Sequence, residues 1–393
     1  MGAIVLLVAI LSPLINVMWG RLRKEDSTTL DEDKDRISSD VERPQEYSGN
    51  GSTTGVHPGI SVVITVDDES ESLRDNLPKW LSQKYDGEYQ IVVVSTSNDP
   101  QVENILKLQS ANPKLYTTFI PSSSRYMSRK KLAVTVGVKA AKYDWILLTD
   151  VDCHPVSDSC LSALSAKCSP STDIILGSST FDEGCRKSEL FDYTYLLCRQ
   201  MSKAVKGNTW GYSGKSLMFR KSMFINGKGF DGNLKYIRGE YEFIVNKYSS
   251  GNNTVVCTSD NGIMSQEPLS SKQWKNKVMN YLAIREQLKD TVKPRILFNL
   301  SMGSMILSNI ITLGVCIYSV LSSLWILTAV SAIAFLLNVL LRICILRRSL
   351  SVHLPEISSV RLLWYEETLP FRNMMRLVIY RMTDKYDFIS HKI

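Results

Sequence analysis

Apolar runs and helical periodicities alternate between about residues 58 and 150. Continuous apolar, β-branched runs predict strands at residues 60–66, 90–94, 115–120 and 145–148. Apolar residues at helical spacing predict helices at residues 73–83, 102–109 and 130–141. Strands that alternate with helices pair in parallel through right-handed crossovers. We therefore expect an α/β fold with a Rossmann-like parallel sheet.

Three longer apolar segments lie outside this pattern. Residues 1–20 carry no charge and would reach about 30 Å as a helix, which predicts a membrane anchor. A cleaved signal peptide is the alternative, but the segment lacks a basic start and a good cleavage site. No charged residue occurs from Ile296 to Leu341, a stretch too long for one crossing. We expect a transmembrane hairpin at residues 296–345 with its turn at residues 318–323, rather than a buried soluble hairpin.

The net charge of +7 gathers beside these apolar segments, which indicates membrane contact and not nucleic acid. The basic residues are Arg21, Arg23, Lys24, Lys293, Arg295, Arg342, Arg347 and Arg348. Because basic flanks stay on the cytoplasmic side, they predict a multi-pass protein of the inner (plasma) membrane. Its central region and C-terminus would lie in the cytoplasm.

The remaining segments differ in composition. Residues 21–57 are polar and charged and predict a flexible linker, whereas residues 58–290 hold the predicted domain. Residues 350–393 mix basic and large apolar side chains, which fits an amphipathic helix at the membrane interface or one docked on the soluble domain. Eight cysteines without a Cys-x-x-Cys pair argue against a zinc site and a disulfide framework.

The strongest chemical signal is the pair Asp150 and Asp152, directly after the apolar run at residues 145–148. Alternate side chains of a strand share a face, so both carboxylates can meet at the carboxyl edge of the sheet. Ligands of open α/β sheets bind at that edge. Carboxylate oxygens there suit Mg²⁺ or Mn²⁺. The alternative is an ordinary Asp-rich turn.

Six further segments accompany these acids in a fixed order. They are residues 65–69 (Thr-Val-Asp-Asp-Glu), 94–99 (Val-Ser-Thr-Ser-Asn-Asp), 128–133 (Ser-Arg-Lys-Lys-Leu-Ala), 211–221, 239–243 (Gly-Glu-Tyr-Glu-Phe) and 270–277. The order resembles the family 2 glycosyltransferases with their GT-A fold, in the membrane-bound, processive-synthase-like branch. The resemblance implies a nucleotide-diphospho-sugar transferase domain combined with three transmembrane helices.

On the donor side, the resemblance assigns binding of the nucleotide sugar to the first three segments. The residues that it implicates are Thr65, Asp67, Glu69, Ser95, Lys130, Lys131 and Asp150. Asp150 and Asp152 would hold Mg²⁺ or Mn²⁺. Asp67 and Asp68 replace the family's Tyr and Asn, and Ser95 stands where a carboxylate usually contacts the base. A UDP-sugar is the favoured donor, although Ser95 leaves the nucleobase undecided.

On the acceptor side, Glu240 occupies the position of the family's general base, with Asp152 as its metal-binding counterpart, and Glu242 lies beside it. Acids that complement a helix dipole are the alternative explanation, and Glu242 fits it better than Glu240 does. Gly214 would let the backbone approach a sugar closely. Trp274 could stack on a sugar ring and Lys277 could meet the diphosphate, or both could belong to a helix on the membrane surface. Processivity stays open.

Together these features predict a metal-dependent, inverting glycosyltransferase. It would move a sugar from a nucleotide-sugar donor to a lipid-linked or cell-envelope glycan acceptor. A catalytically inactive GT-A-like scaffold or glycan-binding subunit is the alternative, because of the departures at Asp67, Asp68, Ser95 and Glu240. A nucleotidyltransferase would need a Gly-rich phosphate loop, which the first strand lacks. The sequence leaves the sugar and the acceptor open.

Overall fold

The structure is a computed structural model. It describes residues 2–19, 57–66, 69–96, 99–121, 128–350, 354, 356–384 and 387. Two compact units form. The helical unit combines the N-terminal helix with Cys185–Lys203 and Leu269–Asp384, and the sheet unit combines Ala204–Pro268 with the described residues between 57 and 184. Two segments of the predicted domain of residues 58–290 thus group with the helices, and the predicted domain bounds stay a prediction.

The sheet unit is built on a seven-stranded sheet with the strand order β3-β2-β1-β4-β8-β6-β9. These strands are β1 (Ile60–Val66), β2 (Tyr89–Thr96), β3 (Leu115–Ile120), β4 (Trp145–Asp150), β6 (Ile174–Leu176), β8 (Leu217–Arg220) and β9 (Thr254–Val256). A smaller sheet has the order β5-β10-β7. Its strands are β5 (Cys153–Pro155), β7 (Ser179–Phe181) and β10 (Met264–Gln266).

All four predicted strands are present, and β1 to β4 pair in parallel as expected. The sheet is nevertheless mixed, because β8 runs antiparallel to β4 and to β6. The predicted parallel pairing is thus confirmed for β1 to β4, whereas the antiparallel strand β8 was not predicted. The apolar pattern of a sequence predicts that a strand exists, but it does not predict in which direction the strand runs in the sheet. Here β8 starts beside the carboxyl end of β4.

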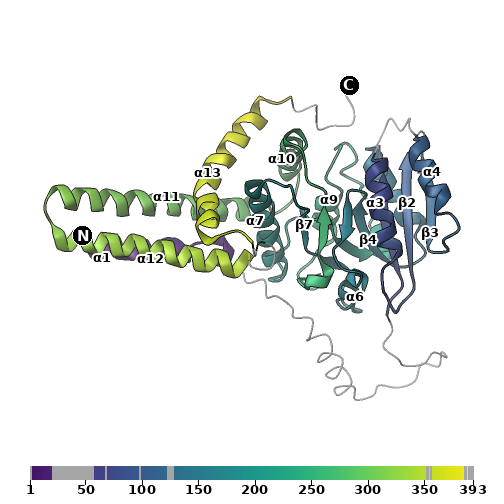
Figure 1. The fold of residues 1–393 in the computed structure, drawn as a ribbon, viewed down its shortest axis with the longest axis horizontal. Coiled ribbons are helices and arrows are strands. Elements are labelled where there is room, and N and C mark those ends of the chain that lie inside the picture. Colours follow the sequence, from purple (N-terminus) through teal and green to yellow (C-terminus); the bar gives the residue numbers. More distant parts are fainter. Residues whose placement is uncertain are drawn as a thin grey trace, which may run out of the picture. The chain divides into compact units, whose positions relative to one another are not determined.

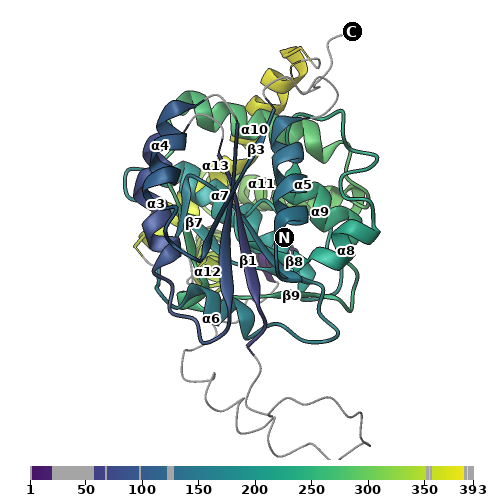
Figure 2. The same ribbon diagram turned by 90° about the vertical axis from the view of Figure 1, so that its right-hand side faces the viewer.

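Helices cover both faces of the large sheet. They are α3 (Ser70–Leu81), α4 (Pro100–Leu108), α5 (Arg129–Ala140), α6 (Cys160–Ser165), α8 (Lys221–Asn226) and α9 (Glu240–Tyr248). Figure 2 shows α3 and α4 on one side of the sheet and α5, α8 and α9 on the other. Helix α5 packs closely on β1 and β2 at Gly137. A Cβ atom at Gly137 would lie 2.5 Å from Cγ1 of Val63 and 2.9 Å from Cγ2 of Val94.

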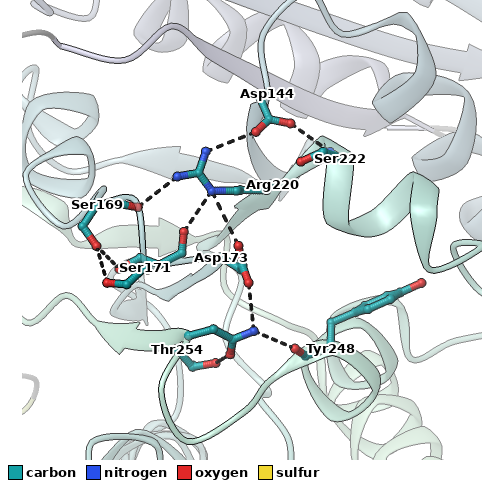
Figure 3. A network of polar contacts seen from close by, with 10 residues as sticks. Asp144, Ser169, Ser171, Asp173, Arg220, Ser222, Tyr248 and Thr254 are labelled. Atoms are coloured by element: carbon teal, nitrogen blue, oxygen red, sulfur yellow. Dashed lines mark hydrogen bonds and ion pairs between the residues drawn. The ribbon is translucent and has the colours of Figure 1, made fainter. Parts of the chain in front are cut away.

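A polar network fixes β8 on β4 (Figure 3). Arg220, the last residue of β8, donates to Oδ2 of Asp144 at 3.2 Å and to the carbonyl oxygen of Ser169 at 2.9 Å. It also pairs with Asp173 at 3.6 Å. The backbone N–H of Ser222 donates to Oδ1 of Asp144 at 2.8 Å. These contacts hold the start of β4 against the end of β8 and so set the register between them.

The helical unit contains six long helices among its described residues. They are α1 (Gly2–Leu14), α7 (Lys187–Ala204), α10 (Ser271–Arg285), α11 (Val292–Leu321), α12 (Trp325–Leu350) and α13 (Ser359–Met382). Figure 1 shows α11 and α12 side by side as a hairpin. Their turn lies at residues 322–324, slightly later than predicted, because α11 continues to Leu321. Helix α13 packs against α10, α11 and α12.

Of the described helices, α11 and α12 are long and apolar enough to cross a membrane. Helix α1 has 13 residues and packs against both of them. At about 1.5 Å per residue this helix alone falls short of the hydrocarbon thickness of about 30 Å. The predicted span of residues 1–20 is therefore only partly helical, and the N-terminal anchor stays a prediction.

A buried polar network joins helices α1, α12 and α13 of this unit. Arg342 is 1% exposed and Glu366 is 0% exposed, and they pair at 3.3 Å. Arg342 also donates to Ser12 at 2.9 Å and to Asn338 at 3.1 Å, while Asn16 donates to Glu366 at 2.9 Å. The predicted place of Arg342 as a cytoplasmic flank stays a prediction, and the residue has a structural role in addition. It lies inside α12, where a carboxylate of α13 compensates its charge.

Replacing Gly137 by Ala should destabilise the sheet unit by about 1–3 kcal/mol, because the added methyl group overpacks the contact with β1 and β2. The melting temperature of the full-length protein in detergent measures this loss. Lys139→Ala, at an exposed position of the same helix, is the control and should melt like the wild type. A Gly137→Ala protein that melts no lower than this control would contradict the packing described for α5.

Removing one member of the buried ion pair, by Arg342→Met or Glu366→Leu, should cost about 3–5 kcal/mol because the other charge stays buried without its partner. The double variant should lose less than the sum of the two single losses. Melting temperatures in detergent give the comparison, with Arg361→Met at an exposed position of α13 as the control. Strictly additive losses would show that the two side chains do not interact.

Candidate active site

A single buried carboxylate collects three donors at the carboxyl end of β4. Asp150, the last residue of β4, is 6% exposed. Its Oδ1 atom lies 2.8 Å from the Lys130 ammonium and accepts a hydrogen bond from the Tyr241 hydroxyl at 3.1 Å. Its Oδ2 atom accepts from Lys215 at 2.6 Å. The donors come from α5, α9 and the loop before β8, so Asp150 joins three segments that are distant in sequence.

The sheet register explains how Lys215 reaches Asp150. Strands β4 and β8 are antiparallel, with Trp145 opposite Arg220 and Leu148 opposite Leu217. Continuing this register by two residues brings Lys215 opposite Asp150. Lys130 arrives from the other side, in the first turn of α5, whose N-terminus begins at the same edge.

The charges of this cluster depend on one another. Burial by itself would raise the pKa of Asp150, but Lys130 and Lys215 outweigh it and hold that pKa well below its usual range. Burial would lower the pKa of Lys215, yet Asp150 and then Asp152 raise it instead. The pKa of Tyr241 is raised by burial and by Asp150. Near neutral pH, Asp150 and Lys215 are therefore charged and the Tyr241 hydroxyl is a neutral donor.

The carboxylates do not fit a metal site that both of them share. Each oxygen of Asp150 already contacts an ammonium group. Asp152 lies in the turn after β4, where its Oδ1 atom accepts from the Cys153 thiol at 3.2 Å. Among the described residues, no group of three or more Asp, Glu, His or Cys side chains that could hold a metal ion is present. A divalent ion between Asp150 and Asp152 would lie beside two ammonium groups, so the predicted joint ligation disagrees with this arrangement.

Two other predicted donor-site residues lie at the same edge of the sheet. Thr65 is opposite Asp150, and Ser95 is opposite Val66. Both are buried, and among the described residues the Thr65 hydroxyl has no hydrogen-bond partner. The structure thus brings Thr65, Ser95 and Asp150 to one edge.

The loop after β1 holds two more predicted residues. Asp67 lies outside the described residues. Glu69 is exposed and immediately precedes α3, where its side chain makes no capping hydrogen bond. Its predicted role in donor binding remains a prediction.

Lys131 has a different place from its neighbour Lys130. It is fully buried, and its ammonium group donates to the carbonyl oxygens of Asn233 at 2.7 Å and Tyr236 at 2.6 Å. Burial lowers its pKa to about 8, against the opposing charge of Glu240. The predicted contact of Lys131 with the donor diphosphate does not fit this enclosure. Lys131 instead supports the loop that leads into α9.

Glu240 is the first residue of α9 and follows Gly239, whose φ of 104° favours glycine. Glu240 is 3% exposed, and its Oε1 atom has no hydrogen-bond partner among the described residues. Buried polar atoms without partners are rare and often functional. The next residue, Tyr241, contacts Asp150, whereas Glu242 is half-buried. The start of α9 therefore carries a buried acid close to the end of β4.

Gly214 directly precedes Lys215 and is needed for local packing. A Cβ atom there would lie 2.2 Å from the Tyr212 hydroxyl. That hydroxyl donates to the carbonyl oxygens of Gly177 at 2.6 Å and Ser216 at 2.9 Å. Close approach at Gly214 thus serves the Tyr212 side chain, and the predicted approach of a sugar there remains a prediction.

Trp274 and Lys277 lie in α10 of the helical unit. Trp274 is buried, and the Lys277 ammonium lies 4.6 Å from the centre of the Tyr193 ring of α7. Their proposed contacts with sugar and diphosphate remain predictions.

Lys215 and Tyr241 are the site residues that the sequence patterns did not single out. Lys215 lies inside the segment of residues 211–221, and Tyr241 lies between two acids that drew attention instead. Lys215 could have been found only from the antiparallel pairing of β8 with β4, which places it opposite Asp150. Successive residues of a helix point about 100° apart, so Tyr241 and Glu240 at the start of α9 face different directions.

The model of glycosyl transferase family 21 matches residues 34–384. The chain belongs to glycosyl transferase family 21. This is a GT-A-type glycosyltransferase family, so the predicted kinship with GT-A enzymes and the predicted fold class are confirmed. Membership also supports the assignment of this chain as a glycosyltransferase.

Individual relatives of this family 21 chain are distant. The poly-β-1,6-N-acetyl-D-glucosamine synthase of Staphylococcus aureus is 24% identical over 173 residues, which cover 43% of this chain and 41% of the relative. The chain thus spans about two fifths of the length of the curated relatives that it matches. A Pyrobaculum calidifontis mannosyltransferase, solved with GDP-Man and Mn²⁺, is 12% identical with a TM-score of 0.47 and covers 87% of this chain and 98% of its own. S. aureus TarS 1–349, solved with UDP-GlcNAc, is 13% identical with a TM-score of 0.43, at 80% and 92% coverage.

Tyr241→Phe should weaken the cluster around Asp150, because it removes one donor from a buried, charged acceptor. Hydrogen bonds to charged groups contribute about 1.5–3 kcal/mol. The expected result is a lower melting temperature of the full-length protein. Tyr236→Phe is the matched control, because its hydroxyl makes no hydrogen bond to any described residue. Equal melting temperatures for the two variants would mean that the Tyr241 bond adds nothing.

Proposed function

We propose that this chain is a membrane-anchored, inverting glycosyltransferase that uses a nucleotide-sugar donor, with a UDP-sugar as the favoured one. The acceptor is a lipid-linked or cell-envelope glycan. One observation carries the proposal: a charged cluster around Asp150 lies at the carboxyl edge of the sheet, and α9, which begins with the buried acid Glu240, contacts it through Tyr241. Ligands of open α/β sheets bind at this edge.

The helical unit supports a place in the membrane. Among the helices that the structure describes, α11 and α12 are the two candidate spans. Lys293 and Arg295 lie at the start of α11, and Arg347 and Arg348 lie in the last turn of α12. Because basic flanks favour the cytoplasmic side, we infer that both ends of this hairpin face the cytoplasm. The sheet unit would then work in the cytoplasm, where nucleotide sugars are made, as part of a multi-pass protein of the inner (plasma) membrane.

The proposed reaction is a single displacement. The acceptor hydroxyl oxygen forms a bond to C1 of the donor sugar while the bond from C1 to the diphosphate oxygen breaks. The leaving diphosphate keeps the electron pair of that bond. Glu240 accepts the proton of the acceptor hydroxyl, because it is buried and one of its oxygens is unpartnered among the described residues. One displacement inverts the configuration at C1.

Turnover of nucleotide sugars by the full-length protein in detergent tests this proposal. Incubation with UDP- and GDP-sugars, with Mg²⁺, with Mn²⁺ and with a chelator, should release nucleoside diphosphate from at least one donor. Release that depends on an added glycolipid or glycan would identify the acceptor class. Absence of turnover for every donor in every condition would favour an inactive scaffold.

Replacing Glu240 by Gln should lower the rate of sugar transfer about 10²- to 10⁴-fold, because the variant keeps the shape but loses the proton acceptor. Donor binding should stay close to that of the wild type. Glu71→Gln is the matched control, since Glu71 also lies in the first turn of a helix but is exposed. A Glu240→Gln enzyme as fast as the control would remove Glu240 from the mechanism.

A further inference from the structure

Lys130 and Lys215 present two ammonium groups to one carboxylate. Their side chains are only 21% and 19% exposed. Lysine is rarely buried to this extent unless it is paired. Both ammonium groups contact Asp150, so they lie side by side at the carboxyl edge of the sheet. The reaction as described gives them no role.

Asp150 alone does not account for both lysines. Each Asp150 oxygen contacts one ammonium, and the Asp152 carboxylate also acts on Lys215. Each ammonium has three N–H donors, of which Asp150 takes one. The Tyr241 hydroxyl is a third donor to the same carboxylate. The two ammonium groups therefore have more N–H donors than their contacts with Asp150 use.

The position of the two ammonium groups and their spare donors indicates the kind of ligand. Lys130 lies in the first turn of α5, a helix of 12 residues whose N-terminus faces the same edge. Free N–H groups and the helix dipole favour an anion there. The Thr65 hydroxyl, which has no hydrogen-bond partner among the described residues, is on the neighbouring strand, opposite Asp150. Positive charge with spare donors at this edge suits a phosphate-bearing ligand.

We propose that Lys130 and Lys215 bind the diphosphate of the donor nucleotide and compensate its charge as it leaves, in place of a divalent ion shared by Asp150 and Asp152. This inference rests on the proposed function. Asp150 is then a positioning residue that keeps the two ammonium groups together. As the bond from C1 to oxygen breaks, the electron pair moves to the diphosphate, where the lysine N–H groups donate to its oxygens. No proton transfer from either lysine is needed.

Binding of diphosphates in the presence of a chelator tests this site. Isothermal titration of the full-length protein in detergent with EDTA would use UDP, GDP and inorganic pyrophosphate, which carries the diphosphate without a base. Wild-type protein should bind at least one of them. Lys130→Met and Lys215→Met should each weaken binding about 10- to 100-fold, as expected for loss of a hydrogen bond between charged groups. Lys139→Met, with its exposed side chain on the same helix, should bind like the wild type.

A second pair of variants separates binding from folding. Lys130→Arg and Lys215→Arg keep the charge and should retain most of the affinity, even if the Met variants melt at a lower temperature. Binding that vanishes in EDTA and returns with Mg²⁺ or Mn²⁺ would overturn the inference and leave the proposed function standing. Met variants that bind as tightly as Lys139→Met would overturn it as well. Lysine-dependent binding without any sugar transfer would support the site and contradict the proposed enzyme.

Discussion

Three donors on the buried Asp150 carboxylate hold the candidate active site together. Burying a charge is unfavourable unless it is paired and hydrogen-bonded, and here the pairing comes from different parts of the chain. Lys130 brings the start of α5, Lys215 brings the loop before β8, and Tyr241 brings the start of α9. These contacts offset the free-energy cost of burying the Asp150 carboxylate. The contact of Tyr241 also fixes the start of α9, where Glu240 is the preceding residue.

The helical unit also contains a buried, paired charge, but there the pair serves structure alone. Arg342 and Glu366 are both buried, and neighbouring helices supply hydrogen bonds to each of them. Their opposite charges balance, which suits a structural contact inside a helix bundle. Around Asp150, in contrast, two lysines face one carboxylate and keep donors in reserve. Spare N–H donors at the carboxyl edge of the sheet distinguish this cluster from the structural ion pair.

Much of this arrangement follows from local sequence, and the exceptions have physical causes. The strand of residues 60–66 has the predicted limits, because a continuous apolar run defines a buried strand. The strand of residues 115–120 also has its predicted limits, although only its last residue is buried. Adjacent lysines look equivalent in a sequence, but Lys130 and Lys131 point in directions about 100° apart on α5. Only tertiary packing decides which one faces the site. The contact of Lys215 with Asp150 depends on an antiparallel register that no local pattern reveals.

The most direct test is a structure of the full-length protein with UDP or GDP bound and no divalent ion added. The account predicts diphosphate oxygens within hydrogen-bond distance of the ammonium groups of Lys130 and Lys215. Glu240 should face the position where a donor sugar would continue from the diphosphate. A diphosphate bound away from both lysines, or a Glu240 side chain directed away from the nucleotide, would contradict it.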